Sequence, residues 1–193
     1  MMRAIQNLPT DYKEIYSINL QKNKKIAIFI NVLALLIAAA MVIPMNFFIP
    51  ISTLFNMENG SKNYSIRYLV FIGALVAYMC LHELVHGITM KAFGTKKVKY
   101  GFTGMYAFAG SDDYYDKKSY ITIALAPIVV FMFVFAIINL IVPHEWFWVV
   151  YLLQIINISG AAGDIFVTVK FAKMPKDIMV KDSGVSMTVY SKQ

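Results

Sequence analysis

Two histidines and a glutamate stand together within an otherwise apolar stretch of this chain. The run His82-Glu83-Leu84-Val85-His86 places two imidazoles four residues apart, and so on one face of a helix, with a carboxylate beside the first. These are the components of a zinc site with a built-in general base. The alternative is that the polar groups only satisfy one another between helices. Three ionisable groups at a metal spacing would be a costly way to do that, so the run predicts a metal site.

A catalytic zinc ion takes three protein ligands and keeps one position open, so a third ligand must come from another segment. His86 lies five residues before Lys91, and Asp164 lies six residues before Lys170. Each lies in a predicted membrane span, and the two spans run in the same direction across the membrane. At 1.5 Å per residue, both side chains lie ~7–9 Å from the basic ends of their helices. This match in depth predicts Asp164 as the third ligand.

Asn157 shares a helical stripe with Asp164, because Gly160, Ala161 and Asp164 follow it at i+3, i+4 and i+7. Small residues let apolar helices approach closely, which would bring the short aspartate onto a metal held by the histidines. Asn157 itself is a candidate to stabilise an oxyanion or hold a substrate strand. The alternative is that Asn157 and Asp164 only hydrogen-bond between helices. Other possible ligands lie in predicted loops. His144 and Glu145 are expected on the far side of the membrane, and Asp112, Asp113 and Asp116 are expected to form a solvated acidic patch.

The composition indicates an integral membrane protein. Of 193 residues, 59% are hydrophobic and 15% charged, whereas soluble domains average about 45–50% and about 25%. A hydrocarbon core of ~30 Å needs ~20 apolar residues per helix. Four segments have that length: Ile26–Pro44, Tyr68–Met90, Tyr120–Val142 and Trp146–Val169. The fold class expected is therefore an all-α membrane protein, a bundle of about four transmembrane helices with small cytoplasmic strands.

The basic residues predict the orientation of these spans. Sixteen of the eighteen lysines and arginines lie before the first span, between the second and third, or after the fourth. Positive loops face the cytoplasm, so we expect a multi-pass protein of the cell membrane with both termini cytoplasmic. The net charge of +7 is thus explained by membrane flanks, and no nucleic-acid partner is expected. A single cysteine, Cys80, excludes an internal disulfide, and the first span is expected to be an uncleaved anchor.

The segments outside the spans carry weaker patterns. Residues 10–25 are expected to form a short interfacial helix with Tyr12, Ile15, Tyr16 and Ile18 on its apolar side. Residues 97–108 alternate with period two and predict a hairpin, and residues 178–190 predict two strands around Asp182-Ser183-Gly184. Pro44 and Pro50 are expected to end the first span and leave an irregular apolar connector.

The His-Glu-x-x-His run resembles that of the site-2 protease group of intramembrane zinc proteases. In that group a Phe-Gly turn, here Phe93-Gly94, follows the metal-binding helix, and a small membrane-associated sheet comes next. The four-span layout, Ala126-Pro127 and the run from Asn157 to Asp164 look closest to a bacterial family of membrane zincin peptidases related to that group. The resemblance covers roughly residues 68–170. It departs from the group where Gly163 and Ile165 flank the aspartate, since the group usually has Leu-Asp-Gly.

The resemblance implies a zinc-dependent endopeptidase that cuts membrane proteins near the cytoplasmic face. His82, His86 and Asp164 would hold Zn²⁺ and Glu83 would be the catalytic base. The expected organisation is a cytoplasmic segment at 1–25, a membrane-embedded metallopeptidase-like domain at 26–170 and a cytoplasmic tail at 171–193. Expected partners are a membrane protein or peptide substrate and the lipid bilayer; the sequence leaves the oligomeric state open. Two alternatives are metal or proton transport by the same polar cluster and an inactive, protease-like binding or immunity protein.

Overall fold

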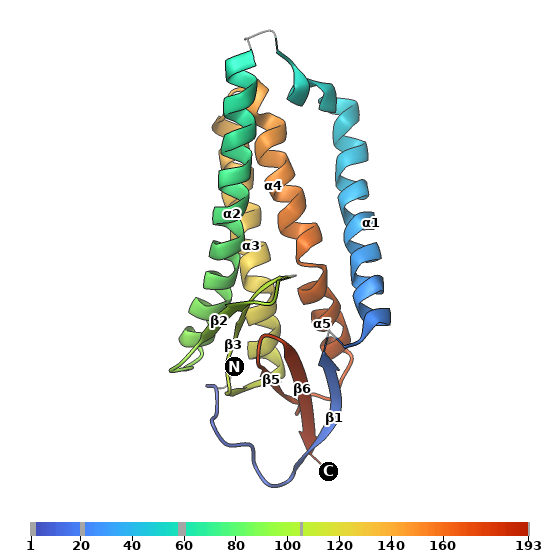
Figure 1. The fold of residues 1–193 in the computed structure, drawn as a ribbon. Helices are drawn as coiled ribbons and strands as arrows, with labels where there is room; N and C mark the ends of the chain where they lie inside the picture. The colour runs from blue at the N-terminus through green and yellow to red at the C-terminus, as the bar shows by residue number, and fades with distance from the viewer. Residues whose placement is uncertain (1–2, 20–21, 58–60, 105, 193) are drawn as a thin grey trace. The chain divides into compact units, whose positions relative to one another are not determined.

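The computed structural model of this protein describes residues 3–19, 22–57, 61–104 and 106–192 (Figure 1). Helices dominate the chain, and short strands lie between and beyond them, as predicted. In chain order the elements are β1 (Tyr12–Asn19), α1 (Lys24–Phe48), the 3-10 helix η1 (Ile51–Phe55), α2 (Ser61–Ala92), β2 (Lys99–Phe102), β3 (Ala107–Gly110), β4 (Tyr114–Asp116), α3 (Lys117–Ile141), the 3-10 helix η2 (His144–Trp146), α4 (Phe147–Gly160), α5 (Ala162–Ala172), β5 (Met179–Asp182) and β6 (Ser186–Lys192).

Four helical stretches among the described residues are long and apolar enough to cross a membrane, judged by length and composition: Lys24–Phe48, Ser61–Ala92, Lys117–Ile141 and His144–Ala172. The four predicted spans lie within these stretches, except that the third was predicted to run one residue further, to Val142. The first helix differs from its prediction, since it passes through Pro44 and ends at Phe48. Apolar helices tolerate an internal proline, and the chain turns into the next short helix at Pro50.

The chain divides into two compact units, each assembled from separate stretches of sequence. The first comprises Met1–Ile30, Leu81–Pro127 and Gly163–Gln193, and the second comprises Asn31–Cys80 and Ile128–Ala162. Helices α1, α2 and α3 each contribute residues to both. All strands belong to the first unit.

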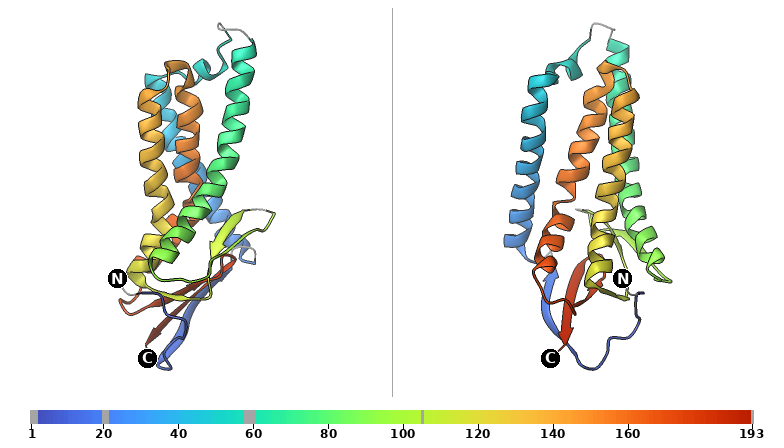
Figure 2. Two further views of the ribbon diagram at one scale, coloured as in Figure 1. Left: turned by 90° about the vertical axis from the view of Figure 1, so that its left-hand side faces the viewer. Right: turned by 180° about the vertical axis from the view of Figure 1, so that it is seen from behind.

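The first unit contains two antiparallel sheets. The larger has the order β1-β6-β5-β4, and the smaller is the hairpin of β2 and β3 (Figures 1 and 2). The strands predicted at 97–108 and 178–190 are thereby confirmed. The helix expected over residues 10–25 is wrong, because residues 12–19 form β1 and pair with β6. Ile18, on one face of this strand, is buried, whereas Ile15, on the other face, is half exposed.

Aromatic and aliphatic side chains from helices and strands form the core of the first unit. Phe171 is fully buried there and packs edge-on against Tyr16 and tilted against Tyr120. Burial of one such ring contributes about 1.5–3 kcal/mol. The remaining buried members of this core are Met90, Tyr115, Ile123, Ala124, Val167, Ile178, Val180 and Val189. This core fixes the last turns of α2, the first half of α3 and α5 as one body.

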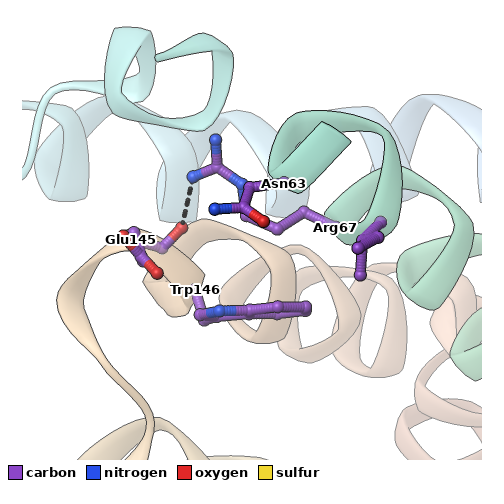
Figure 3. A pocket seen from close by; sticks show the side chains of 5 residues that line it. Asn63, Arg67, Glu145 and Trp146 are labelled. Carbon is purple, nitrogen blue, oxygen red and sulfur yellow. Dashed lines mark hydrogen bonds between the residues drawn. The ribbon is translucent and has the colours of Figure 1, made fainter. Parts of the chain in front are cut away.

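The second unit is apolar and contains no strand among its described residues. Here α4 buries Trp148 and Leu153, whereas α1 buries no side chain along its whole length. The buried polar side chains of the second unit hydrogen-bond mainly to backbone carbonyls. Arg67, for example, donates to the carbonyl oxygens of Asn56 and of Glu145, the latter at 3.0 Å, beside a small cavity of about 120 Å³ (Figure 3).

Candidate metal centre

Helix α2 presents the two motif histidines on one face, inside the first unit. The ring centroids of His82 and His86 are 4.9 Å apart, and each residue is 9% exposed. The segment folds as a helix because residues 61–92 contain no proline and few glycines, so nothing interrupts the run of hydrogen bonds. The predicted geometry of two imidazoles side by side is therefore present.

Asp164 lies against both imidazoles. Its Oδ2 atom is 3.6 Å from Nε2 of His82 and 3.7 Å from Nε2 of His86, and the potential ligand atoms of the three residues lie within 4.8 Å of one another. Ligands bound ~2.0–2.2 Å from a tetrahedral zinc ion stand ~3.3–3.6 Å apart. The distances between the three side chains predicted as ligands are thus close to those that a zinc ion requires.

A break in the fourth apolar segment places Asp164 at the start of a helix. The sequence predicted one continuous span over 146–169, but α4 ends at Gly160 and α5 begins at Ala162. Glycine is a poor helix former, and Gly160 and Gly163 bracket the break. Asp164 consequently sits in the first turn of α5, where unpaired N–H groups and the helix dipole favour a negative charge.

The far side of the His86 ring is held by helix α3. Nδ1 of His86 lies 2.9 Å from the backbone oxygen of Ile123. A carbonyl oxygen only accepts, so Nδ1 carries the hydrogen and Nε2 faces Asp164 with its lone pair when the ring is neutral. Metal-binding histidines usually donate their other ring N–H to such a partner, which fixes the orientation of the ring.

Glu83 lies beside the cluster and is held by the β2–β3 hairpin. The backbone N–H of Ala109, in β3, donates to the Glu83 carboxylate. His86, Asp164 and Asp182 are close enough to act on this carboxylate electrostatically. The acid is therefore next to the three potential ligands but is not one of them, which suits a general base.

Sequence reasoning did not single out Asp182 and its partner Tyr120. The Tyr120 hydroxyl donates to Oδ2 of Asp182 at 2.7 Å, and the Gly184 N–H donates to Oδ1 at 2.8 Å. Asp182 is 7% exposed, and burial raises its pKa. The only signal in the sequence was an acid in the turn between two predicted strands, and such a residue is normally solvent-exposed.

The turn at Asp182 also seats the hairpin that reaches Glu83. Gly184 has φ +85° and leaves room for the ring of Phe108, and Gly110 packs directly on the backbone of Ser183. The Ser111 N–H donates to the Asp182 carbonyl oxygen at 2.7 Å. The residues on both sides of Ala109 are thus fixed by the C-terminal turn.

Asn157 belongs to the second unit and is fully buried. Its amide oxygen accepts from the Tyr78 hydroxyl at 3.1 Å, and its amide nitrogen donates to the Ile128 carbonyl at 3.0 Å. Both ends of the side chain are therefore engaged in helix-to-helix hydrogen bonds, which was the alternative role considered for it. Its proposed part in stabilising an oxyanion stays a prediction.

The rival acids and histidine have other positions. Asp112 pairs with Lys99 at 2.6 Å, and Asp116 accepts from Ser119 at the start of α3. His144 and Glu145 form part of η2, in the second unit. Among the described residues, His82, His86 and Asp164 form the one group of three or more side chains able to hold a metal. Two imidazole nitrogens and one carboxylate oxygen are a donor set that fits zinc.

Comparison with known proteins bears on this cluster. A family model described as "Putative zincin peptidase" matches residues 75–179, which include both histidines, Glu83 and Asp164. The "Uncharacterized 24.7 kDa protein in gap 5'region" of Pyrococcus woesei is 32% identical over 138 residues, which cover 68% of this chain and 59% of the relative. The chain thus spans about three fifths of that relative's length. No solved structure matches the chain. Since the family match takes in more than half of its residues, this chain belongs to the putative zincin peptidase family.

Proposed function

We propose that this protein is a zinc-dependent endopeptidase of the cell membrane, related to the site-2 protease group. The observation that carries the proposal is the cluster of His82, His86 and Asp164 with Glu83 beside it, on helices apolar enough for a bilayer. Catalytic zinc sites with two histidines and a carboxylate hydrolyse peptide bonds in soluble zincins. A hydrolytic site on such helices would serve substrates held in or at the membrane.

His82, His86 and Asp164 would hold the zinc ion, which when bound supplies Lewis-acid activation of the attacking water and the scissile carbonyl. The carboxylate of Glu83 accepts a proton from that water and returns it to the leaving amine. The hydrogen bond from the Ala109 backbone would limit the movement of this carboxylate. The Ile123 carbonyl holds the His86 ring.

The substrate would be a stretch of a membrane protein that has unwound near the cytoplasmic surface. In the two-stranded sheet β2 is an edge strand, and Lys99, Tyr100 and Phe102 are exposed along it. An extended peptide can add to such an edge through main-chain hydrogen bonds. Because the smaller sheet also carries Ala109, a peptide paired with β2 would lie in the unit that contains Glu83.

The orientation of the chain is part of the proposal. Both termini would be cytoplasmic, because the basic residues gather on the side of the strands and of the histidine end of α2. Water would then reach the site from the cytoplasm. Zinc would stay bound during turnover, which separates this function from metal transport by the same side chains.

The experiment uses purified protein and a dye-quenched transmembrane peptide reconstituted in nanodiscs. Glu83→Gln should keep wild-type zinc content, because Glu83 is not a ligand, and lose about 10²–10⁴-fold in cleavage rate. Cys80→Ser, an exposed change outside the cluster, is the control and should cleave normally. Full cleavage by Glu83→Gln would contradict the proposal. Zinc flux into proteoliposomes without any cleavage would favour a transporter.

A further inference from the structure

Pro127 lies inside α3, which continues unbroken on both sides of it. The residue is fully buried. Proline has no backbone N–H, so the carbonyl four residues earlier loses its helical donor. That carbonyl belongs to Ile123.

The Ile123 carbonyl is the group that holds His86. The Nδ1–H of His86 donates to it over 2.9 Å, in a buried position. A side-chain donor from another helix has therefore taken the place of the missing N–H at residue 127. The hydrogen bond fixes the ring so that Nε2 points to Asp164, 3.7 Å away.

We propose that Pro127 is a positioning residue of the metal centre, since it frees the Ile123 carbonyl to orient His86. The proposal rests on the proposed zinc function for its purpose, but its structural core concerns one hydrogen bond. A carbonyl oxygen has two lone pairs, so an N–H at residue 127 would share it with His86. Sharing would draw the oxygen towards the axis of α3 and weaken the bond to the ring. We therefore expect a looser His86 and weaker zinc binding, with the site still formed.

Two substitutions separate this effect from a loss of packing. Pro127→Ala and Pro127→Val both restore the backbone N–H, and valine also refills the volume of the ring. An effect that the two variants share comes from the N–H. Pro44→Ala is the matched control, because Pro44 is likewise internal to a long helix, α1, but lies in the second unit.

The first readout is the Nδ1–H of His86 in metal-free protein, labelled with ¹⁵N-histidine. The chain has only three histidines, so the side-chain signals can be assigned by substitution. In wild type and in Pro44→Ala this hydrogen should exchange slowly with water. In both Pro127 variants its exchange should accelerate by about tenfold or more, because a weakened buried bond opens more often.

The second readout is zinc affinity, measured by chelator competition with Zn²⁺ alone. Loss of a partner that orients a metal-binding histidine typically weakens affinity about 10–100-fold, and we expect the lower end of that range for both Pro127 variants. Wild-type exchange of the Nδ1–H in both variants would overturn the proposal. If exchange accelerates as expected but wild type binds no zinc, the positioning role stands and the proposed metallopeptidase function fails.

Discussion

The two units of this molecule treat polar side chains differently. In the first unit His86, Tyr120 and Asp182 are buried and bonded to partners from other helices or strands. In the second, Arg67, Trp148 and Asn157 connect helices and turns, mainly through backbone carbonyls. The described histidine and acid of this unit, His144 and Glu145, are exposed. The first unit therefore buries ionisable side chains that could do chemistry, whereas the buried polar groups of the second unit hold its helices and connections together.

This contrast explains why a short membrane-type chain carries two sheets. Long apolar helices alone would leave Glu83 with few hydrogen-bond donors, because the backbone N–H groups of a helix are already used. A strand has N–H groups along its edge, and Ala109 of β3 supplies one of them to Glu83. A strand thus supplies a hydrogen-bond donor to a site whose ionisable side chains lie on helices.

The largest expected effect concerns packing in the core of the first unit. Phe171→Ala removes a fully buried ring from the first unit and should cost about 3–5 kcal/mol in the free energy of unfolding. Leu35→Ala, on α1, changes a side chain that is 71% exposed and should cost little in detergent. Denaturant titrations of the two variants measure this, and equal costs would contradict the difference in burial between the core of the first unit and α1.

The next effect concerns the turn that holds the hairpin. An alanine at Gly184 would place its Cβ 2.1 Å from the Phe108 ring, whereas a Cβ at Gly104, which has a similar φ of +86°, would meet no atom within 4 Å. Gly184→Ala should displace Ala109 and lower kcat about 10–100-fold at unchanged zinc content. Gly104→Ala carries the same backbone strain and should stay near wild type. Partial recovery in Gly184→Ala/Phe108→Ala would show that the loss passes through the ring.

Much of this organisation could be predicted from local pattern. The His-Glu-x-x-His spacing, the four apolar lengths and the period-two strands depend on neighbours in sequence, and depth along two helices was enough to bring Asp164 to the histidines. The strand β1 could not be predicted in this way, because its partner β6 lies at the other end of the chain. Residues 12–18 fit a helical stripe as well as a strand, and only the distant pairing decides between them.

The supporting residues were missed for a similar reason. Nothing near Asp182 in sequence indicates that Tyr120 will donate to it, 62 residues away. The role of the Ala109 backbone N–H could not be predicted either, because every residue except proline carries such a group. The break before Asp164 did have a signal, since Gly160 and Gly163 flank it, but the apolar run around them favoured one continuous span.

The smallest effect concerns pH at the edge of the first unit. The backbone N–H of Lys192 and the Ser191 hydroxyl hold the pKa of Asp177 below its usual value of 3.8. A lowered pKa means that folding favours the ionised form, so this stabilisation is present above pH 3.8 and is lost as the pH falls through the lower, folded-state value. Asp177→Asn should therefore melt slightly below wild type at pH 7, and the gap should close in acid. A gap that widens in acid would contradict this.

The most direct test of the metal centre is the zinc content of Asp164→Ala, measured beside wild type and His86→Ala. Wild type should bind about one zinc ion per chain, since three protein ligands form one site. Both variants should lose tight binding, because two ligands that remain cannot hold the ion against a chelator. If Asp164→Ala retained full zinc content and wild-type affinity, the third ligand would lie elsewhere and the assignment of the metal centre would be wrong.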